Sequence, residues 1–291
     1  MKLTDINIRD PFILVHDGKY YMYGTRVDGN TAYGAWGQQT GFDVYVSTDL
    51  VHWSEPKCVF EQSDRFWATM DFWAPEVHAY NGRFYMLATF KSPTRHRATH
   101  ILVCDTPDGT FTPLSPDPAT PADWESLDGT LYVDAAGDPY LVFCHEWAQI
   151  GNGTVCATKL SRDLSTPLGE PRVLWHADDF KDVHTVRAGT ESYVTDGPYL
   201  HRCQNGDLLA IWSTFDKNGY VELVSKSDNG DISGNWTLCD QPLSAEDGGH
   251  GMIFRGLDGQ LRFVMHRPNT PTKERPVLLP LSEKDGVLTL Q

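Results

Sequence analysis

Long apolar stretches are missing from this 291-residue sequence, whose apolar runs extend over only a handful of residues. No transmembrane helix fits such runs, because a helix needs about 20 apolar residues to span a bilayer. Basic residues are also few: 24 Lys and Arg stand against 39 Asp and Glu, which gives a formal net charge of -15. A chain this acidic repels nucleic acid and anionic membranes, so we expect neither as a partner.

Cysteine is scarce as well, with six residues and no Cys-x-x-Cys pair. This spacing argues against a small disulfide scaffold and against a structural zinc site. Segment 1–9 has neither an apolar core nor a small-residue cleavage site, so it does not read as a signal peptide. Reduced cysteines and the missing leader predict a cytoplasmic protein, although a secreted chain trimmed of its leader would look the same.

One pattern recurs five times along the chain. A polar start leads into a short apolar run, a turn with glycine follows, and a second apolar or aromatic run completes the copy. The turn glycines are residues 18, 82, 137, 206 and 259. Each copy reads as a β-hairpin, because glycine adopts the positive φ that such turns need. Helical periodicity is weak and no Pro- or Ser-rich linker divides the chain, so residues 1–291 are expected to form one domain.

The copies also have similar lengths. Their turn glycines lie 64, 55, 69 and 53 residues apart, which leaves room for about four short strands in each copy. Segments 41–53 and 220–225 are strand-like and supply some of the additional strands. Repeated four-stranded units are typical of propeller blades. The sequence therefore predicts an all-β fold, a five-bladed β-propeller. A β-sandwich also alternates strands and turns, but it would not repeat the same turn in this way.

Charged and aromatic residues occupy the same place in every copy, eight to ten residues before the turn glycine. They are Asp10, Trp73 or Ala74, Asp128, Asp196 and His250. In a propeller the innermost strand of each blade lines the channel, so these residues should meet at one mouth. A single Asp in such a place is more often a turn opener that caps its own backbone. Three in matching register, beside a Trp and a His, favour a functional site.

Converging carboxylates repel one another, which raises the pKa of at least one of them. Cleavage of a glycosidic bond needs such a pair, since one carboxyl protonates the leaving oxygen and the other activates a water. Aromatic side chains would supply flat apolar faces on which sugar rings stack. The candidates are Trp36, Trp73, Trp147 and Tyr193. The expected partner is therefore a small carbohydrate, an oligosaccharide.

At these residues the sequence resembles glycoside hydrolase family 43, five-bladed propellers that remove arabinose or xylose from plant polysaccharides. The matching segments are 9–13, 47–53, 72–77, 127–129 and 196–200. The family is inverting, and the resemblance implies that Asp10 is the general base and that Asp128 tunes the acid. It also implies that His250 faces the channel and helps to hold a cation, often calcium, through waters. Hydrogen bonding to a carboxylate or a carbonyl is an equal interpretation for this histidine.

The general acid is where the sequence departs from the family. Members usually carry Glu before the Gly-Pro of the fourth blade, whereas this chain has Asp196, whose arm is one methylene shorter. Three interpretations stay open: Asp196 is the acid of an adjusted site, Glu146 or Glu191 replaces it, or the protein no longer hydrolyses its ligand. We favour Asp196 over Glu146, for which holding a sugar hydroxyl or an arginine is an equal interpretation.

The leading hypothesis is an inverting, exo-acting glycoside hydrolase that requires no cofactor, either an α-L-arabinofuranosidase or a β-xylosidase. The alternative is a catalytically weak or inactive carbohydrate-binding propeller. The basic segment Arg95-His96-Arg97 is interpreted as a solvated loop rather than as a clamp for substrate.

Overall fold

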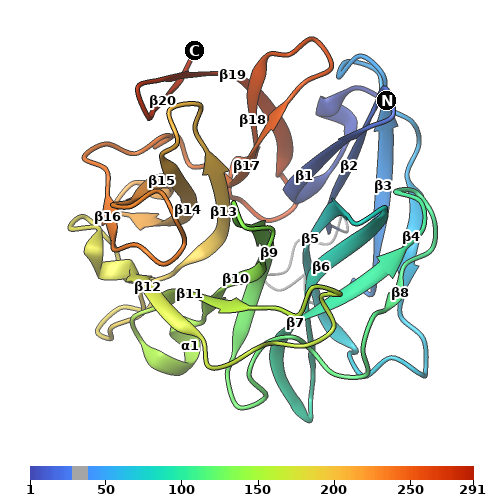
Figure 1. Cartoon of the computed structure of the whole chain (residues 1–291), viewed down its shortest axis with the longest axis horizontal. Coiled ribbons are helices and arrows are strands. Elements are labelled where there is room, and N and C mark those ends of the chain that lie inside the picture. The colour runs from blue at the N-terminus through green and yellow to red at the C-terminus, as the bar shows by residue number, and fades with distance from the viewer. Residues whose placement is uncertain (28–38) are drawn as a thin grey trace.

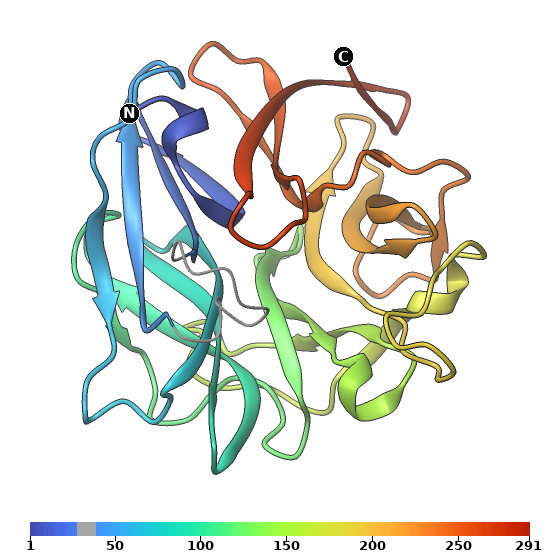
Figure 2. The same ribbon diagram turned by 180° about the vertical axis from the view of Figure 1, so that it is seen from behind.

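Five four-stranded antiparallel sheets are arranged around a common axis, as Figures 1 and 2 show from opposite sides. The computed structural model describes residues 1–27 and 39–291. Each sheet is one blade, and each blade is built from one continuous stretch of chain with its strands in sequence order. The all-β class and the five-bladed propeller predicted from the sequence are confirmed.

The strands run from the inside of each blade to its outer edge. Blade 1 comprises β1 (Ile8–His16), β2 (Lys19–Arg26), β3 (Gly41–Ser47) and β4 (Lys57–Glu61). Blade 2 comprises β5 (Met70–Tyr80), β6 (Arg83–Ser92), β7 (Arg95–Cys104) and β8 (Thr112–Pro113). Blade 3 comprises β9 (Ser126–Val133), β10 (Pro139–His145), β11 (Thr154–Lys159) and β12 (Arg172–His176). Blade 4 comprises β13 (Asp196–Arg202), β14 (Leu208–Asp216), β15 (Gly219–Ser227) and β16 (Trp236–Leu238). Blade 5 comprises β17 (Gly249–Arg255), β18 (Leu261–Arg267), β19 (Arg275–Lys284) and β20 (Val287–Leu290).

Within residues 1–27 and 39–291, helical structure is confined to short pieces. They are the 3-10 turns η1 (Leu3–Asp5) and η3 (Ala177–Asp179) and the single-turn helix α1 (Trp147–Ile150). In the part of the chain that the structure describes, no helix has the length and apolar character needed to cross a membrane.

The predicted turn glycines do join the first two strands of each blade. Asp17 and Gly18 between β1 and β2 have φ values of 45° and 70°, and Asn81 and Gly82 between β5 and β6 have values of 46° and 78°. Two consecutive positive φ angles are the signature of the turn that matches the twist of a two-stranded hairpin. The remaining turn glycines, at positions 137, 206 and 259, also have positive φ. All six cysteines are free.

The apolar core lies between neighbouring blades. The largest cluster joins blades 1 and 2 to part of blade 5, and smaller clusters join blade 2 to 3, blade 3 to 4 and blade 4 to 5. Within the largest cluster five phenylalanine rings contact one another with centroids 4.9–6.2 Å apart: Phe42, Phe60, Phe66, Phe72 and Phe90. Because each blade buries both faces in this way, the inner strands are held in fixed positions.

A β-bulge interrupts every inner strand at the same place near its start. The first residue of each bulge has a φ between 46° and 56°, and these five residues are Asp10, Ala74, Asp128, Gly197 and His250. A bulge bends its strand and re-aims the neighbouring side chains. The predicted register is therefore correct in four blades and shifted by one residue in blade 4, where Gly197 takes the bulge and Asp196 precedes it.

The N–H of each bulge residue donates a hydrogen bond to a neighbouring blade. Ala74, Asp128 and His250 donate to Thr25, Thr89 and Ser213, each on the second strand of the preceding blade, over 2.7–2.9 Å. Asp10 donates to Nδ1 of His266 at 3.2 Å, and Gly197 donates to Oδ2 of Asp128 at 3.1 Å. These five bonds run around the ring and lock the starts of the inner strands together.

Candidate active site

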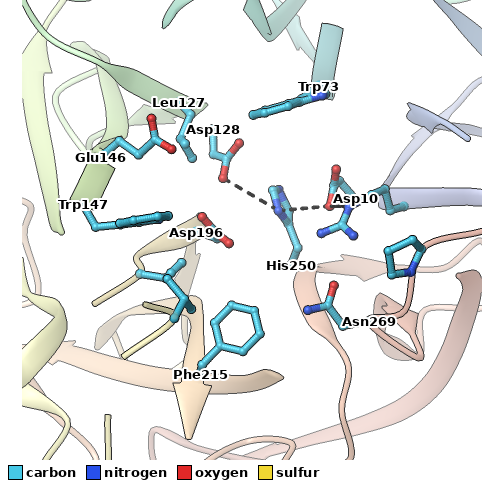
Figure 3. A pocket seen from close by; sticks show the side chains of 14 residues that line it. Asp10, Trp73, Leu127, Asp128, Glu146, Trp147, Asp196, Phe215, His250 and Asn269 are labelled. Carbon is cyan, nitrogen blue, oxygen red and sulfur yellow. Dashed lines mark ion pairs between the residues drawn. The ribbon is translucent and has the colours of Figure 1, made fainter. Parts of the chain in front are cut away.

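A pocket of about 330 Å³ opens where the inner strands begin (Figure 3). Its volume lies at the lower end of the range for small-molecule sites, roughly 300–1,000 Å³. All five blades contribute to its lining through the residues at or just before the bulges: Arg9, Asp10, Trp73, Leu127, Asp128, Asp196 and His250. The three aspartates predicted to meet from distant repeats therefore share one cavity.

Asp10 is held by positive charge. Its Oδ2 accepts a 2.6 Å hydrogen bond from the Thr25 hydroxyl, and its Oδ1 lies 3.2 Å from Nδ1 of His250 and 3.5 Å from Nε of Arg9. Burial alone would raise the pKa of this carboxyl, but the charges of His250 and Arg9 and the Thr25 bond together outweigh it. They lower the pKa of Asp10 to about 2. Asp10 is therefore ionised at neutral pH, the state that a general base needs.

Asp128 stands on the other side of His250, with its Oδ2 3.8 Å from the same Nδ1 (Figure 3). Burial raises the pKa of Asp128, and the negative charges of Asp196 and Asp10 raise it further, while His250 opposes them. The pKa reaches about 8. The two carboxylates that flank His250 are thus pushed to opposite protonation states, as general acid-base chemistry requires.

Asp196 accepts a 2.9 Å hydrogen bond at Oδ2 from the hydroxyl of Tyr220. Burial raises the pKa of Asp196 and the charge of Asp10 adds to this, while His250, Tyr220 and Arg9 lower it by less. Because Asp128 and Asp196 also influence each other, the pair retains a proton at neutral pH. This agrees with the expectation that convergence would raise the pKa of at least one carboxyl.

Glu146 faces the same pocket but forms an ion pair with a cation. The Arg97 guanidinium donates to Oε2 of Glu146 and, over 2.8 and 3.1 Å, to Oδ2 of Asp71. Its Cζ also lies 4.4 Å from the centre of the Trp73 ring. Burial raises the pKa of Glu146, and the neighbouring Arg97 charge opposes that rise. The interpretation of Glu146 as the partner of an arginine therefore matches the contacts it makes.

The arrangement of the propeller and its carboxylates agrees with a match between residues 4–287 and the family described as Glycosyl hydrolases family 43. The chain belongs to glycosyl hydrolase family 43. The resemblance seen in the sequence is confirmed. Family 43 consists of inverting glycoside hydrolases that act through carboxylates.

Several family 43 relatives carry informative names. A solved endo-arabinase from Bacteroides thetaiotaomicron VPI-5482 is 37% identical, with 98% of each chain covered and a TM-score of 0.90. Xylosidase/arabinosidase 43A of Humicola insolens is 26% identical over 152 residues, which are 50% of this chain and 46% of that protein. Extracellular endo-alpha-(1->5)-L-arabinanase 1 of Bacillus subtilis (strain 168) is 23% identical over 175 residues, which are 56% of this chain and 49% of that protein. The match spans about half the length of these last two relatives.

Two of the four aromatic candidates line the pocket of this family 43 protein. Trp73 comes from β5, and Trp147 comes from α1, where the guanidinium of Arg187 lies 4.6 Å from the centre of its ring. Trp36 lies outside the described residues. The indoles of Trp73 and Trp147 thus line the same pocket as the carboxylates, the arrangement that stacking of a sugar ring on them needs.

The structure places three further side chains of the sequence analysis away from the pocket lining or outside a loop. Tyr193 is not among the residues that line the pocket. Side chains alternate along an extended chain, and Val194 faces the pocket instead. Glu191 is exposed and does not line the pocket either. Arg97 belongs to strand β7 and its side chain keeps 11% of its surface, whereas that of Arg95 on the same strand keeps 47%. The interpretation as a solvated loop therefore fails at Arg97.

His250 occupies the position at which the family resemblance implies a cation. Its ring packs against Gly197 so closely that a Cβ there would lie 2.6 Å from Cδ2. Burial lowers the pKa of His250, but the charges of Asp10, Asp128 and Asp196 raise it by more. Among the described residues at the pocket, no three His, Cys, Asp or Glu ligand atoms lie within 4.8 Å of one another. These residues therefore do not fit a directly coordinated ion, and a channel calcium held through waters stays a prediction.

Strand β15 supplies two site residues that the sequence analysis missed. The hydroxyl of Tyr220 donates a hydrogen bond to Asp196. Glu222 is fully buried and accepts hydrogen bonds from the Ser213 hydroxyl at 2.6 Å and from the Gly251 N–H at 3.3 Å. Burial raises the pKa of Glu222 to about 7. A glutamate in an otherwise apolar strand was the available signal, since Glu is rarely buried without a role. Its spacing of two from Tyr220 places both side chains on one face.

Proposed function

We propose that this protein hydrolyses linkages of L-arabinose with inversion and releases single sugars from the ends of oligosaccharides. One observation carries the proposal: an ionised Asp10 shares a pocket with the Asp128–Asp196 pair, which retains a proton. An inverting enzyme needs one carboxylate to activate water and one carboxylic acid to protonate the leaving oxygen.

In the proposed reaction Asp10 accepts a proton from a water whose oxygen attacks the anomeric carbon. The glycosidic bond breaks, and its oxygen takes the proton of Asp196. Asp128 and Asp196 hold this proton jointly, because ionising both neighbouring carboxyls is unfavourable, so Asp128 can pass its proton to Asp196 as Asp196 protonates the leaving oxygen. Glu146 and Arg97 form a fixed charged pair at the pocket that orients sugar hydroxyls. Both aspartates return to their starting states by exchange with solvent, so the reaction needs no cofactor.

The choice of sugar is supported by the relatives, since the three named above are described as an endo-arabinase, an endo-arabinanase and a xylosidase/arabinosidase. Release from chain ends is supported by the pocket, whose volume of about 330 Å³ suits a small ligand better than a long chain. Xylosyl linkages are the second choice, because one relative is named for both sugars.

The decisive measurement is NMR of the anomeric configuration of the products released from arabino- and xylo-oligosaccharides. We expect arabinose as the first product, with inverted configuration. Asp10→Asn should fold normally and lower kcat by several orders of magnitude, because the water loses its base. Unchanged turnover in that variant would remove Asp10 from the base role. Internal cleavage products would show an endo enzyme instead.

The identity of the acid is tested by comparing Asp196→Asn with Glu146→Gln on aryl and natural glycosides. An aryl leaving group needs little protonation. Loss of the acid should therefore leave the hydrolysis of aryl glycosides largely intact and abolish the cleavage of oligosaccharides. We expect this pattern for Asp196→Asn. We expect Glu146→Gln to weaken the binding of both substrates alike, seen as a higher KM. The reverse pattern would assign the acid to Glu146.

A carbohydrate-binding propeller without hydrolysis is the second candidate, and the short arm of Asp196 favours it, because catalysis is sensitive to a displacement of about 1 Å. Calorimetric binding of arabino-oligosaccharides without product release, aryl substrates included, would establish it.

Chelation with EDTA should leave kcat unchanged if hydrolysis uses the carboxylates alone. A loss restored by calcium would support the predicted channel cation.

A further inference from the structure

A second cluster of ligand-type side chains lies between blades 4 and 5, away from the pocket. His201 is the sixth residue of β13, Cys203 follows the end of that strand, and Glu283 belongs to β19. Because Asp196 begins β13 at the pocket, His201 stands five residues further along, roughly 17 Å at 3.3 Å per residue. The cluster therefore lies at the end of the propeller opposite the candidate active site.

Three different ligand atoms converge here. A nitrogen of His201, the sulfur of Cys203 and an oxygen of Glu283 lie within 4.8 Å of one another, and no other group of described His, Cys, Asp or Glu residues does so. The Nε2 of His201 lies 2.8 Å from Oε2 of Glu283. His201 and Cys203 share one face of the strand, since they are two residues apart. The guanidinium of Arg202, between them in sequence, donates to the hydroxyl of Tyr132.

The backbone holds these ligands in place. The N–H of Gln204 donates to Oε1 of Glu283 over 2.7 Å, and the N–H of Cys203 donates to the carbonyl of Asp207 over 2.8 Å. Cys203 is 3% exposed, whereas the His201 side chain keeps 13% of its surface. The site is thus enclosed on the cysteine side and open to solvent at the histidine.

We propose that His201, Cys203 and Glu283 bind one zinc ion, with a water as the fourth ligand. Nitrogen, thiolate and carboxylate are the ligands that zinc takes in proteins. Zinc–ligand distances of about 2.0–2.3 Å place tetrahedral ligand atoms roughly 3.3–3.7 Å apart, so small side-chain adjustments complete the site. Binding releases the thiol proton of Cys203 to solvent, because only the thiolate coordinates.

Two properties of the bound ion follow. The ion would join blade 4 to blade 5 and stabilise the closed ring without taking part in hydrolysis. Binding displaces the thiol proton of Cys203, so the affinity for zinc should increase with pH. A His-x-Cys pair completed by a glutamate some 80 residues away escapes a search for cysteine pairs, which explains why the sequence analysis found no zinc site.

The test uses the full chain stripped with EDTA and then titrated with zinc chloride or cobalt chloride. We expect about one zinc per chain by metal analysis and a near-ultraviolet thiolate-to-cobalt band. Cys203→Ser should lose that band, and Glu283→Gln should bind zinc at least about ten-fold more weakly. Zinc should raise the Tm of the wild type by several degrees and leave both variants unchanged.

Two control variants match the chemistry without the cluster. His52→Ala removes an exposed histidine that lies 2.8 Å from Asp49, and Cys58→Ser removes an exposed thiol. Both should bind zinc as the wild type does. The proposal is overturned if the wild type binds no more zinc than Glu283→Gln, or if its cobalt complex lacks the thiolate band. Glu283→Gln keeps the test valid should Cys203→Ser fail to fold, because it preserves the size and hydrogen-bonding capacity of the side chain.

Discussion

Individual side chains decide which carboxyl of the pocket carries the proton. The Tyr220 hydroxyl donates to Asp196 and thereby stabilises its ionised form. Tyr220→Phe removes this bond, so the pKa of Asp196 should rise and the acid should stay protonated to higher pH. We expect the alkaline limb of the kcat/KM profile to move upward and kcat to fall about ten-fold as the carboxyl loses its support. The pH profile on an oligosaccharide measures both effects.

A matched control for Tyr220→Phe is Tyr132→Phe, whose hydroxyl contacts Arg202 at the far end of β9. Its pH profile should match that of the wild type. If the alkaline limb of Tyr220→Phe stays in place, Asp196 is not the acid, and Glu146 becomes the better candidate.

The raised pKa of Asp128 makes the free energy of unfolding depend on pH. Because burial and its acidic neighbours raise the pKa of Asp128 to about 8, the folded chain keeps a proton that the unfolded chain releases near pH 4. The free energy of unfolding therefore falls as pH rises between about 4 and 8. Asp128→Asn is neutral at every pH, so its Tm relative to the wild type should be higher at pH 8 than at pH 5. Thermal unfolding at the two pH values tests this, and an equal difference at both would contradict the raised pKa.

Whether the sequence predicts a site residue depends on whether a motif nearby in the chain marks its position. Asp10, Asp128 and His250 were predictable, because each stands at a fixed distance from a turn glycine that marks its own blade. Arg97 was not, since its partner Asp71 lies on β5 and its partner Glu146 lies just before α1, and no local motif marks such a convergence.

At the scale of elements, the bulge of β13 packs directly against the ring of His250. Gly197 has a φ of 51°, and a Cβ added to it would lie 2.6 and 2.7 Å from Cδ2 and Cγ of His250. Gly197→Ala should therefore displace the imidazole from between Asp10 and Asp128. We expect kcat/KM to fall by at least about 100-fold, together with a Tm several degrees lower from strain and overpacking. Kinetics and thermal unfolding give the two values.

Gly137→Ala separates the clash from backbone strain. Gly137 also has a positive φ, of 80°, but a Cβ there meets no atom within 4 Å. This variant should lose some stability and keep its full activity. Equal activity losses in both variants would show that the contact with His250 is unimportant.

The elements themselves were largely readable from the sequence, and so was the register of their inner strands except in blade 4. Turn glycines fix where a hairpin reverses, and this alone gave the five blades. The bulge inserts a residue that no propensity signals, so Asp196 precedes the bulge of its blade while Asp10 and Asp128 occupy theirs.

At the scale of the whole molecule, the ring closes between blade 1 and blade 5, and no strand of the described residues pairs across this boundary. Blades 1 and 5 share no sheet, and their inner strands β1 and β17 meet side by side (Figure 1). Individual contacts bridge this boundary. The Asn7 amide donates to the carbonyl of Thr272 over 3.1 Å, and the N–H of Leu257 donates to the Tyr20 hydroxyl over 2.8 Å. Because these contacts join residues more than 200 positions apart, the sequence does not reveal them.

An ion pair between Arg9 and Glu274 also bridges this boundary. The Nη1 of Arg9 lies 3.2 Å from Oε1 of Glu274, whose side chain is fully buried. Glu274→Gln keeps the shape but removes the charge opposite a buried guanidinium, and breaking such a pair costs up to about 3–5 kcal/mol. We expect the Tm to fall by several degrees. As a control, Asp258→Asn removes an exposed ion pair with Arg262 and should leave the Tm nearly unchanged, because solvent screens that pair. If thermal unfolding shows equal small changes for both variants, the boundary between blades 1 and 5 is held by its apolar contacts and not by this charge pair.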